Sequence, residues 1–159
     1  MKQEVTFERV SDENFGDFVY LIERLAEYER QCLPDNKAKI RLRKDVLSDN
    51  PKFEAYLVSI DRKFVGYFIF YMTYSSYLAL STLYLEDIFV LEEYRRKDIG
   101  QKMFQFCVQQ AKERGCGRME WTVYDWNEPA IKLYRKIKAT RLNKMYYRLD
   151  REQIENFSD

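Results

Sequence analysis

The sequence lacks histidine entirely and is poor in cysteine, glycine and proline. Its 159 residues include three cysteines, five glycines and three prolines. Without histidine, catalytic triads and acid–base chemistry that use imidazole are excluded, as are most zinc enzymes. Cys32, Cys107 and Cys116 are odd in number and show neither a CxxC nor a zinc-type spacing. We therefore expect neither a disulfide framework nor a metal site, and we interpret Cys107 as a core residue.

The chain also lacks an excess of charge of either sign and any long apolar run. Its 27 basic and 26 acidic residues give a net charge of +1, so no global field favours nucleic acid or an anionic membrane. No apolar stretch approaches the roughly 20 residues of a membrane-spanning helix. The first residues, Met1 to Val5, lack the apolar core of a signal peptide, which predicts a cytoplasmic protein. The length predicts a single domain over residues 1–159.

Hydrophobic periodicity predicts strands and helices along the whole chain, with no linker or repeat. Strands are predicted at 4–9, 53–60, 64–74, 81–90, 119–123 and 141–149. Helices are predicted at 15–28, 40–47, 99–114, from about 127 onward, and at 151–157. Asp61, Arg62 and Lys63 form a plausible hairpin turn between the second and third strands. The fold class that satisfies this order is α/β (α+β), with one mixed, mostly antiparallel sheet flanked by helices.

A basic turn stands between the strand at 81–90 and the helix that follows it. Its sequence is Arg95, Arg96, Lys97, Asp98, Ile99, Gly100. Three cations and the unpaired amides of a helix N-terminus would converge there, which indicates a site for a pyrophosphate. The Walker A and GxGxxG spacings are both absent. A solvated charge run before a helix is the simpler alternative.

Two carboxylates on the strand before this turn and a phenol on a later helix are further candidates for the site. Glu86 and Asp87 are adjacent on a strand, so they point to opposite faces unless a bulge intervenes. A charge within an apolar strand is costly unless it is paired, so either residue could serve a structural salt bridge instead. Asn127 and Tyr134 are seven residues apart, close to two helical turns, and therefore lie near one helix face.

These segments resemble the GNAT superfamily of acetyl-CoA-dependent N-acetyltransferases, and the element order matches nearly the whole chain. The stretches at 25–29, 84–90 and 126–134 are similar to the spermidine/spermine and thialysine acetyltransferase branch. One departure is Asp98, which occupies the place of the first glycine in the family's Arg/Gln-x-x-Gly-x-Gly/Ala turn. Its charge would face a pyrophosphate, and its Cβ would crowd the backbone; as a helix N-cap, aspartate is suitable.

The resemblance implies a role for each site residue. Tyr134 protonates the CoA thiolate, and Glu86 takes the amine proton through water. Tyr28, Glu29, Glu86 and Asp87 border the acceptor, although the first two could simply be an exposed helix end. The implied acetyl-CoA contacts are the strand backbone at Ile88, Phe89 and Val90, the turn Arg95, Arg96, Lys97, Asp98, Ile99, Gly100 and Gln101, and the side chains of Asn127 and Tyr134.

The implied function is acetyl transfer from acetyl-CoA, a cosubstrate, to a small cationic amine such as a polyamine, diamine or lysine-like compound. The amine attacks directly in a ternary complex, and no metal, nucleic acid or membrane takes part. A homodimer is implied by the branch. Two alternatives stay open: a protein or peptide N-acetyltransferase, and a noncatalytic acyl-CoA-binding protein in which Asp98 has weakened the cofactor site.

Overall fold

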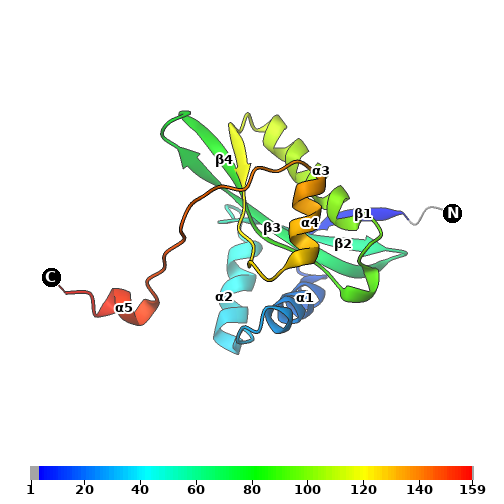
Figure 1. Ribbon diagram of the computed structural model, residues 1–159. Coiled ribbons are helices and arrows are strands. Elements are labelled where there is room, and N and C mark those ends of the chain that lie inside the picture. The colour runs from blue at the N-terminus through cyan, green and yellow to red at the C-terminus, as the bar shows by residue number, and fades with distance from the viewer. Residues whose placement is uncertain (1–3, 159) are drawn as a thin grey trace.

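A five-stranded sheet forms the centre of the computed structural model, which describes residues 4–158 (Figure 1). The ends of the predicted domain, residues 1–3 and 159, lie outside the described residues, and so does most of the N-terminal stretch considered for a signal peptide. The strand order is β1-β2-β3-β4-β5. The strands are β1 Val5–Arg9, β2 Glu54–Ile60, β3 Lys63–Ser75, β4 Leu80–Val90 and β5 Arg118–Glu120. The first four pair antiparallel and β5 runs parallel to β4, so the predicted mixed, mostly antiparallel sheet is confirmed.

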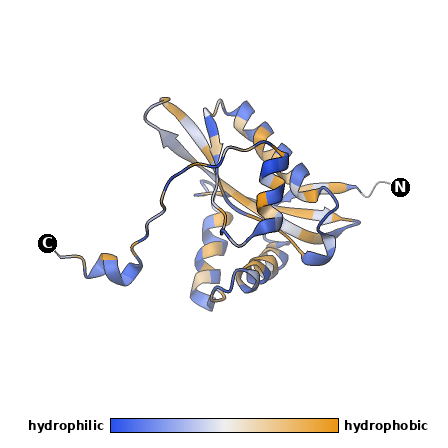
Figure 2. Cartoon of the chain, viewed as in Figure 1, coloured by the Kyte–Doolittle hydropathy of each residue, from blue (hydrophilic) through white to orange (hydrophobic). Residues whose placement is uncertain are grey.

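Helices cover both faces of the sheet. They are α1 Phe15–Tyr28, α2 Asn36–Val46, α3 Ile99–Glu113, α4 Glu128–Lys136 and α5 Arg151–Glu155, with a 3-10 turn at Glu92–Tyr94. One core joins α1 and α2 to the sheet through residues such as Phe18, Leu21 and Tyr67. A second core joins α3 and α4 to the opposite face and includes Met103 and Cys107, both fully buried. In Figure 2 the helices show alternating hydrophilic and hydrophobic patches, as amphipathic helices do.

Turn and cap chemistry explains where several elements begin. The β2–β3 turn uses Asp61 and Arg62, both at positive φ (49° and 66°), which suits a tight hairpin and agrees with the predicted turn. The Asp35 carboxylate accepts a hydrogen bond from the Ala38 amide at 2.7 Å. This N-cap starts α2 at Asn36, so the helix predicted at 40–47 begins four residues earlier than expected.

The C-terminal part of the chain departs most from prediction. β5 ends at Glu120, although a strand as far as Val123 was expected. The predicted strand at 141–149 is absent; these residues are extended and exposed, and they lead to α5 at a distance from the sheet (Figure 1). Their composition is typical of a strand, but a strand needs a neighbouring edge to pair with, and within the described chain this segment has none. In residues 4–158 no helix is long and apolar enough to cross a membrane.

Candidate acetyl-transfer site

A β-bulge in β4 determines the orientation of its two carboxylates. The β3–β4 register passes from Ile69 opposite Asp87 to Phe70 opposite Leu85, so Glu86 is an additional residue in β4. Such a bulge removes the alternation that would separate neighbouring side chains. Glu86 and Asp87 consequently lie on the same face of the sheet, the face that α1 covers.

Two tyrosines of β3 hold these carboxylates. The Tyr67 hydroxyl donates to Asp87 Oδ2 and the Tyr71 hydroxyl donates to Glu86 Oε2, each at 3.1 Å. Tyr67 and Tyr71 are four residues apart on one strand and so share a face. Sequence reasoning missed both residues as members of the site; their even spacing along an aromatic strand, beside a strand with two acids, was the available signal.

Burial changes the acid strength of Asp87. Desolvation, reinforced by the nearby charges of Glu86 and Glu29, raises the pKa of Asp87 to about 7, although the Tyr67 hydrogen bond opposes this shift. Desolvation also raises the pKa of Glu29. The charges of Glu86 and Glu29 therefore act on Asp87, and the three carboxylates make this region acidic within a nearly neutral protein.

The end of α1 meets the start of α4. The Tyr28 hydroxyl donates to Asn127 Oδ1 at 3.2 Å. Asn127 is the N-cap of α4, where its side chain also accepts from the Ala130 amide at 3.4 Å. Two predicted site residues that are 99 positions apart in the chain are thereby in direct contact.

Tyr134 extends from α4 into an aromatic cluster. Its ring packs edge-on against Phe104 and Trp121, with centroids 5.5 and 5.2 Å away. Burial, together with the charge of Glu29, raises the pKa of Tyr134 to about 12. The phenol is therefore protonated at neutral pH, and the charge of Glu29 acts on it. It can serve as a proton donor. Sequence reasoning did not predict that Trp121 packs against Tyr134.

One edge of β4 is left without a strand partner. β5 pairs with β4 only from Thr82 to Tyr84, so the edge at Ile88, Phe89 and Val90 has no strand beside it in the described chain. A ligand with amide groups can pair with such an edge. The Arg95 side chain lies against this edge: its Nε donates to the Val90 carbonyl at 2.8 Å, and its guanidinium covers the Tyr28 ring at 4.5 Å.

The turn before α3 has a glycine-like backbone without the glycines. Arg96 and Asp98 have left-handed φ angles of 63° and 57°. Asp98 occupies the N-cap position of α3, but its side chain makes no capping hydrogen bond and instead accepts from Lys136 Nζ at 3.2 Å. Exposed cations at Arg96 and Lys97, together with amides that no side chain caps, fit an anion such as a diphosphate.

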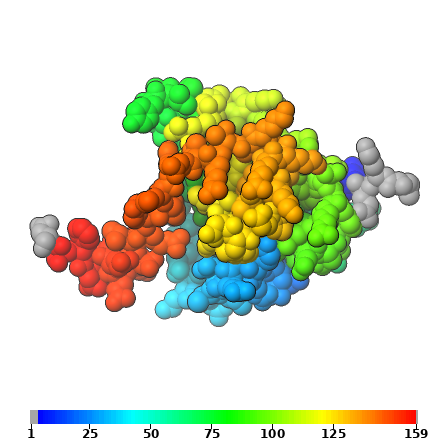
Figure 3. Space-filling view, viewed as in Figure 1, coloured from blue at the N-terminus to red at the C-terminus, as the bar shows by residue number. Residues whose placement is uncertain are grey.

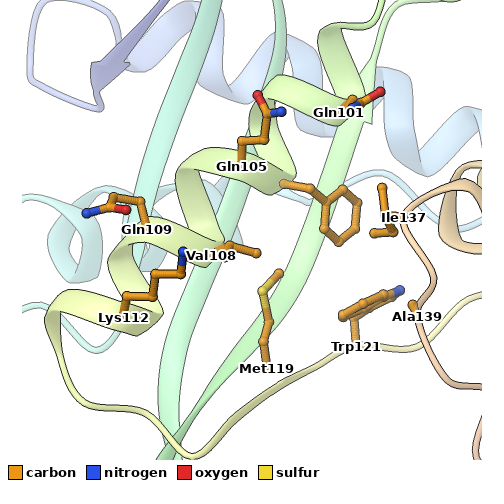
Figure 4. Close-up of a pocket in the computed structure, with 10 residues that line it drawn as sticks. Gln101, Gln105, Val108, Gln109, Lys112, Met119, Trp121, Ile137 and Ala139 are labelled. Carbon is orange, nitrogen blue, oxygen red and sulfur yellow. The ribbon is translucent and has the colours of Figure 1, made fainter.

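The remaining turn residues pack around the start of α3. Ile99 is buried in the core, and a Cβ on Gly100 would approach Leu133 Cδ2 to 3.0 Å, so α4 packs closely at this glycine. Gln101 is half-buried, and its side chain lines a groove between α3 and β5 (Figure 4). Among residues 4–158, no group of three or more acidic, cysteine or histidine side chains is arranged to hold a metal.

Most of the chain is similar in sequence to known N-acetyltransferases. The thialysine N-epsilon-acetyltransferase of Sus scrofa is 33% identical over 135 residues, 80% of this chain and 79% of its own length. The enzyme of the same description from Caenorhabditis elegans is 27% identical over 154 residues, 94% of each chain. The L-ornithine N5-acetyltransferase NATA1 of Arabidopsis thaliana is 43% identical over 74 residues, 46% of this chain and 32% of its own.

Solved structures share the fold at lower identity. An integron cassette protein from the mobile metagenome of V. cholerae matches with a TM-score of 0.80 at 23% identity, over 98% of this chain and 96% of its own. The aminoglycoside N-acetyltransferase AAC(6')-Iy, solved in complex with CoA, matches with a TM-score of 0.76 at 13% identity, over 95% and 97%. Residues 18–138 match the acetyltransferase (GNAT) family. The chain therefore belongs to this family and is an acetyl-CoA-dependent N-acetyltransferase.

Proposed function

We propose that the protein acetylates a primary amine of a small cationic acceptor, such as a polyamine, a diamine or a thialysine- or lysine-like compound. The observation that carries this proposal is the acidic region formed by Glu29, Glu86 and Asp87, in which burial and the charges of Glu86 and Glu29 raise the pKa of Asp87. The relatives named for thialysine and ornithine acetylation support the same class of acceptor.

The acceptor is bound by charge and by hydrogen bonds. Asp87 and Glu29 attract an ammonium group, and the Tyr28 hydroxyl supplies a polar contact beside them. An acceptor with two amines satisfies this arrangement best, because one ammonium stays charged against the carboxylates while the other is deprotonated to react. An alkylamine with a pKa of about 10 arrives protonated at neutral pH, so the reacting amine needs a base.

Glu86 is our choice for that base, acting through a water molecule. It is the bulged residue of β4 and is exposed, so water reaches it, and Tyr71 orients its carboxylate. Tyr134 serves as the acid, because its phenol retains its proton at neutral pH. Acetyl-CoA supplies the acetyl thioester, and the departing thiolate takes the Tyr134 proton.

The cosubstrate is proposed to lie along the free edge of β4 and against the basic turn. The backbone of Ile88 to Val90 pairs with its amides. The turn from Arg95 to Gln101 holds its diphosphate with backbone amides and the exposed cations Arg96 and Lys97. Asn127 contacts the part of the cosubstrate between its amides and its diphosphate. Asp98 is the one negative charge in this turn, and it favours a second candidate function, acyl-CoA binding without turnover.

The test is thiol release from acetyl-CoA across a panel of polyamines, thialysine, lysine, ornithine and N-terminal peptides, with acetyl-CoA affinity measured in parallel. We expect turnover with small diamines or lysine-like amines. Turnover with peptides alone would move the function to protein modification. Tight acetyl-CoA binding without turnover of any acceptor would support the second candidate.

A further inference from the structure

Two large aromatic side chains, Tyr124 and Trp126, lie exposed in the loop between β5 and α4. They are 42 and 48% exposed, although side chains of this kind usually bury most of their surface. Their rings stack, with centroids 5.5 Å apart and planes 15° from parallel. In Figure 3 the yellow segment after β5 lies at the surface, against the blue segment at the end of α1. These two residues, called the aromatic pair below, therefore present ring surface to solvent.

The aromatic pair adjoins the residues proposed to border the acceptor. The Trp126 ring lies 5.5 Å from the Tyr28 ring, centroid to centroid. The Gln31 side-chain amide donates to the Tyr124 hydroxyl and to the Glu29 carbonyl, each at 3.3 Å. Both contacts join the loop to the end of α1. The aromatic pair thus continues the proposed acceptor site outward, from Glu29 toward solvent.

A tight turn holds the two rings in place. The Asn127 amide donates to the Tyr124 carbonyl at 3.0 Å, which closes a four-residue turn. Asn127 is also the N-cap of α4, so the turn is attached directly to a helix. Ring surface that is positioned before a ligand arrives loses little conformational freedom on binding. The aromatic pair is therefore organised in advance for a ligand.

The charges around the aromatic pair favour a cation as its ligand. Residues 121–128 include Asp125 and Glu128, both exposed, and no lysine or arginine. A phosphate-bearing ligand would be repelled by these carboxylates. An ammonium group would be attracted both by the carboxylates and by the negative faces of the rings.

The Arg95 guanidinium already occupies the inner part of this aromatic cluster. It lies 4.5 Å from the centroid of the Tyr28 ring and 5.7 Å from that of Phe89. Within residues 4–158, no lysine or arginine lies over Tyr124 or Trp126 in the same way. The inner ring of the cluster therefore has its cation, whereas the two outer rings are open to one from a ligand.

We propose that the aromatic pair is an outer subsite of the acceptor site, where it binds the far ammonium group of a linear polyamine by cation–π contact. The near amine of the same molecule lies at Glu86, where it reacts. This inference rests on the proposed function, because it concerns the acceptor of the same reaction.

The subsite narrows the class of acceptor. A lysine-like compound carries a carboxylate beside its second ammonium group, and Asp125 and Glu128 repel that carboxylate. A linear polyamine has no such group. Methylation of its far nitrogen is tolerated, because the face of a ring attracts charge without a hydrogen bond. The aromatic pair therefore selects polyamines over amino acids.

Two probes that differ by one charge test the subsite without turnover. One is an aminoalkyl-trimethylammonium ion; the other is the amine in which a carbon atom replaces the quaternary nitrogen, and both are made with spacers of three to six carbons. Calorimetry measures their dissociation constants on enzyme saturated with CoA, which has no acetyl group to transfer. We expect the wild type to bind the charged probe roughly 5- to 30-fold more tightly at the best spacer. In Tyr124→Leu and in Trp126→Leu this ratio should fall by about 3-fold or more.

Two control variants isolate the ring from other effects. Tyr124→Phe keeps the ring and removes the hydroxyl, so its ratio should match that of the wild type. Tyr77→Leu makes the leucine exchange at an exposed tyrosine between β3 and β4, and it should also leave the ratio unchanged. Far-UV circular dichroism checks that each variant folds.

The outcomes separate the subsite from the proposed function. No binding of the charged probe, or an unchanged ratio in both leucine variants, would overturn the subsite. Weaker CoA binding in those variants, with the ratio unchanged, would assign the rings to the cosubstrate instead. Thiol release with polyamines tests the proposed function by itself: turnover with an unchanged ratio refutes only the subsite, whereas the expected ratio without turnover refutes only the function.

Discussion

Tyr134 is the residue that we propose as the proton donor. Its ring is held by Phe104 and Trp121, while its hydroxyl is within the influence of Glu29. Tyr134→Phe keeps the ring packing and removes only the proton. We expect kcat to fall by roughly 10² to 10⁴, about 3 to 5 kcal/mol of barrier, with little change in thermal stability. Unchanged turnover at saturating substrates would remove Tyr134 from the acid role.

Asp98 combines a left-handed backbone with a negative charge beside the proposed diphosphate site. Its carboxylate is 73% exposed and contacts Lys136, an exposed pair that contributes little to stability. Asp98→Gly should stabilise the fold by roughly 0.5 to 1 kcal/mol, because glycine adopts this backbone without strain. It should also tighten acetyl-CoA binding, measured by calorimetry.

Asp98→Asn separates these two effects. Asparagine removes the charge but retains a Cβ at the same φ, so it should tighten acetyl-CoA binding without the gain in stability. Weaker acetyl-CoA binding in both variants would mean that the carboxylate assists the diphosphate site instead of opposing it.

At the scale of elements, one side chain links the end of α1 to the start of α4. Asn127 caps α4 and accepts the Tyr28 hydrogen bond. Asn127→Ala removes both interactions and should destabilise the protein by about 0.5 to 2 kcal/mol in urea unfolding. Asn127→Asp is the control, since its carboxylate accepts the same two hydrogen bonds and should restore stability. Equal stability of all three proteins would show that the two helices are held together elsewhere.

Sequence patterns predicted an element correctly where its own residues determine whether it forms. The amphipathic helix of α3 and the aromatic strands β2, β3 and β4 were predicted within one or two residues. The bulge at Glu86 was not predictable, because it depends on the register between two strands. The strand at 141–149 was wrongly predicted for a related reason: local composition describes what a segment can form, whereas pairing requires an edge from elsewhere.

The candidate site shows the same limit. The sequence pattern indicated Asn127 and Tyr134 on one helix, and the basic turn, because each lies within a short segment. The contacts that Tyr67 and Tyr71 make with Asp87 and Glu86 bridge two strands. They follow from tertiary packing, and no spacing within either strand alone could specify them.

At the scale of the whole molecule, Asp87 makes folding stability depend on pH. Its pKa is raised from 3.8 to about 7 in the folded protein, so the folded state binds more protons than the unfolded chain between these values. Stability contributed by the neutral form is therefore lost as pH rises through 7. Between pH 5 and 8 the unfolding free energy of the wild type should fall by roughly 1 to 3 kcal/mol relative to that of Asp87→Asn. Parallel curves for the two proteins would show that Asp87 titrates normally.

The protein as a whole is nearly neutral, so the proposed preference for cationic acceptors has to arise from the local acidic region. The most direct measurement is the ratio of kcat/KM for putrescine to that for butylamine, which differ by one ammonium group. We predict a ratio of roughly 10 to 100 in the wild type, as expected for about 1 to 3 kcal/mol of attraction to Glu29, Glu86 and Asp87, and a smaller ratio in Glu29→Gln. Equal kcat/KM for the two amines, with turnover of both, would contradict a site built for small cationic acceptors.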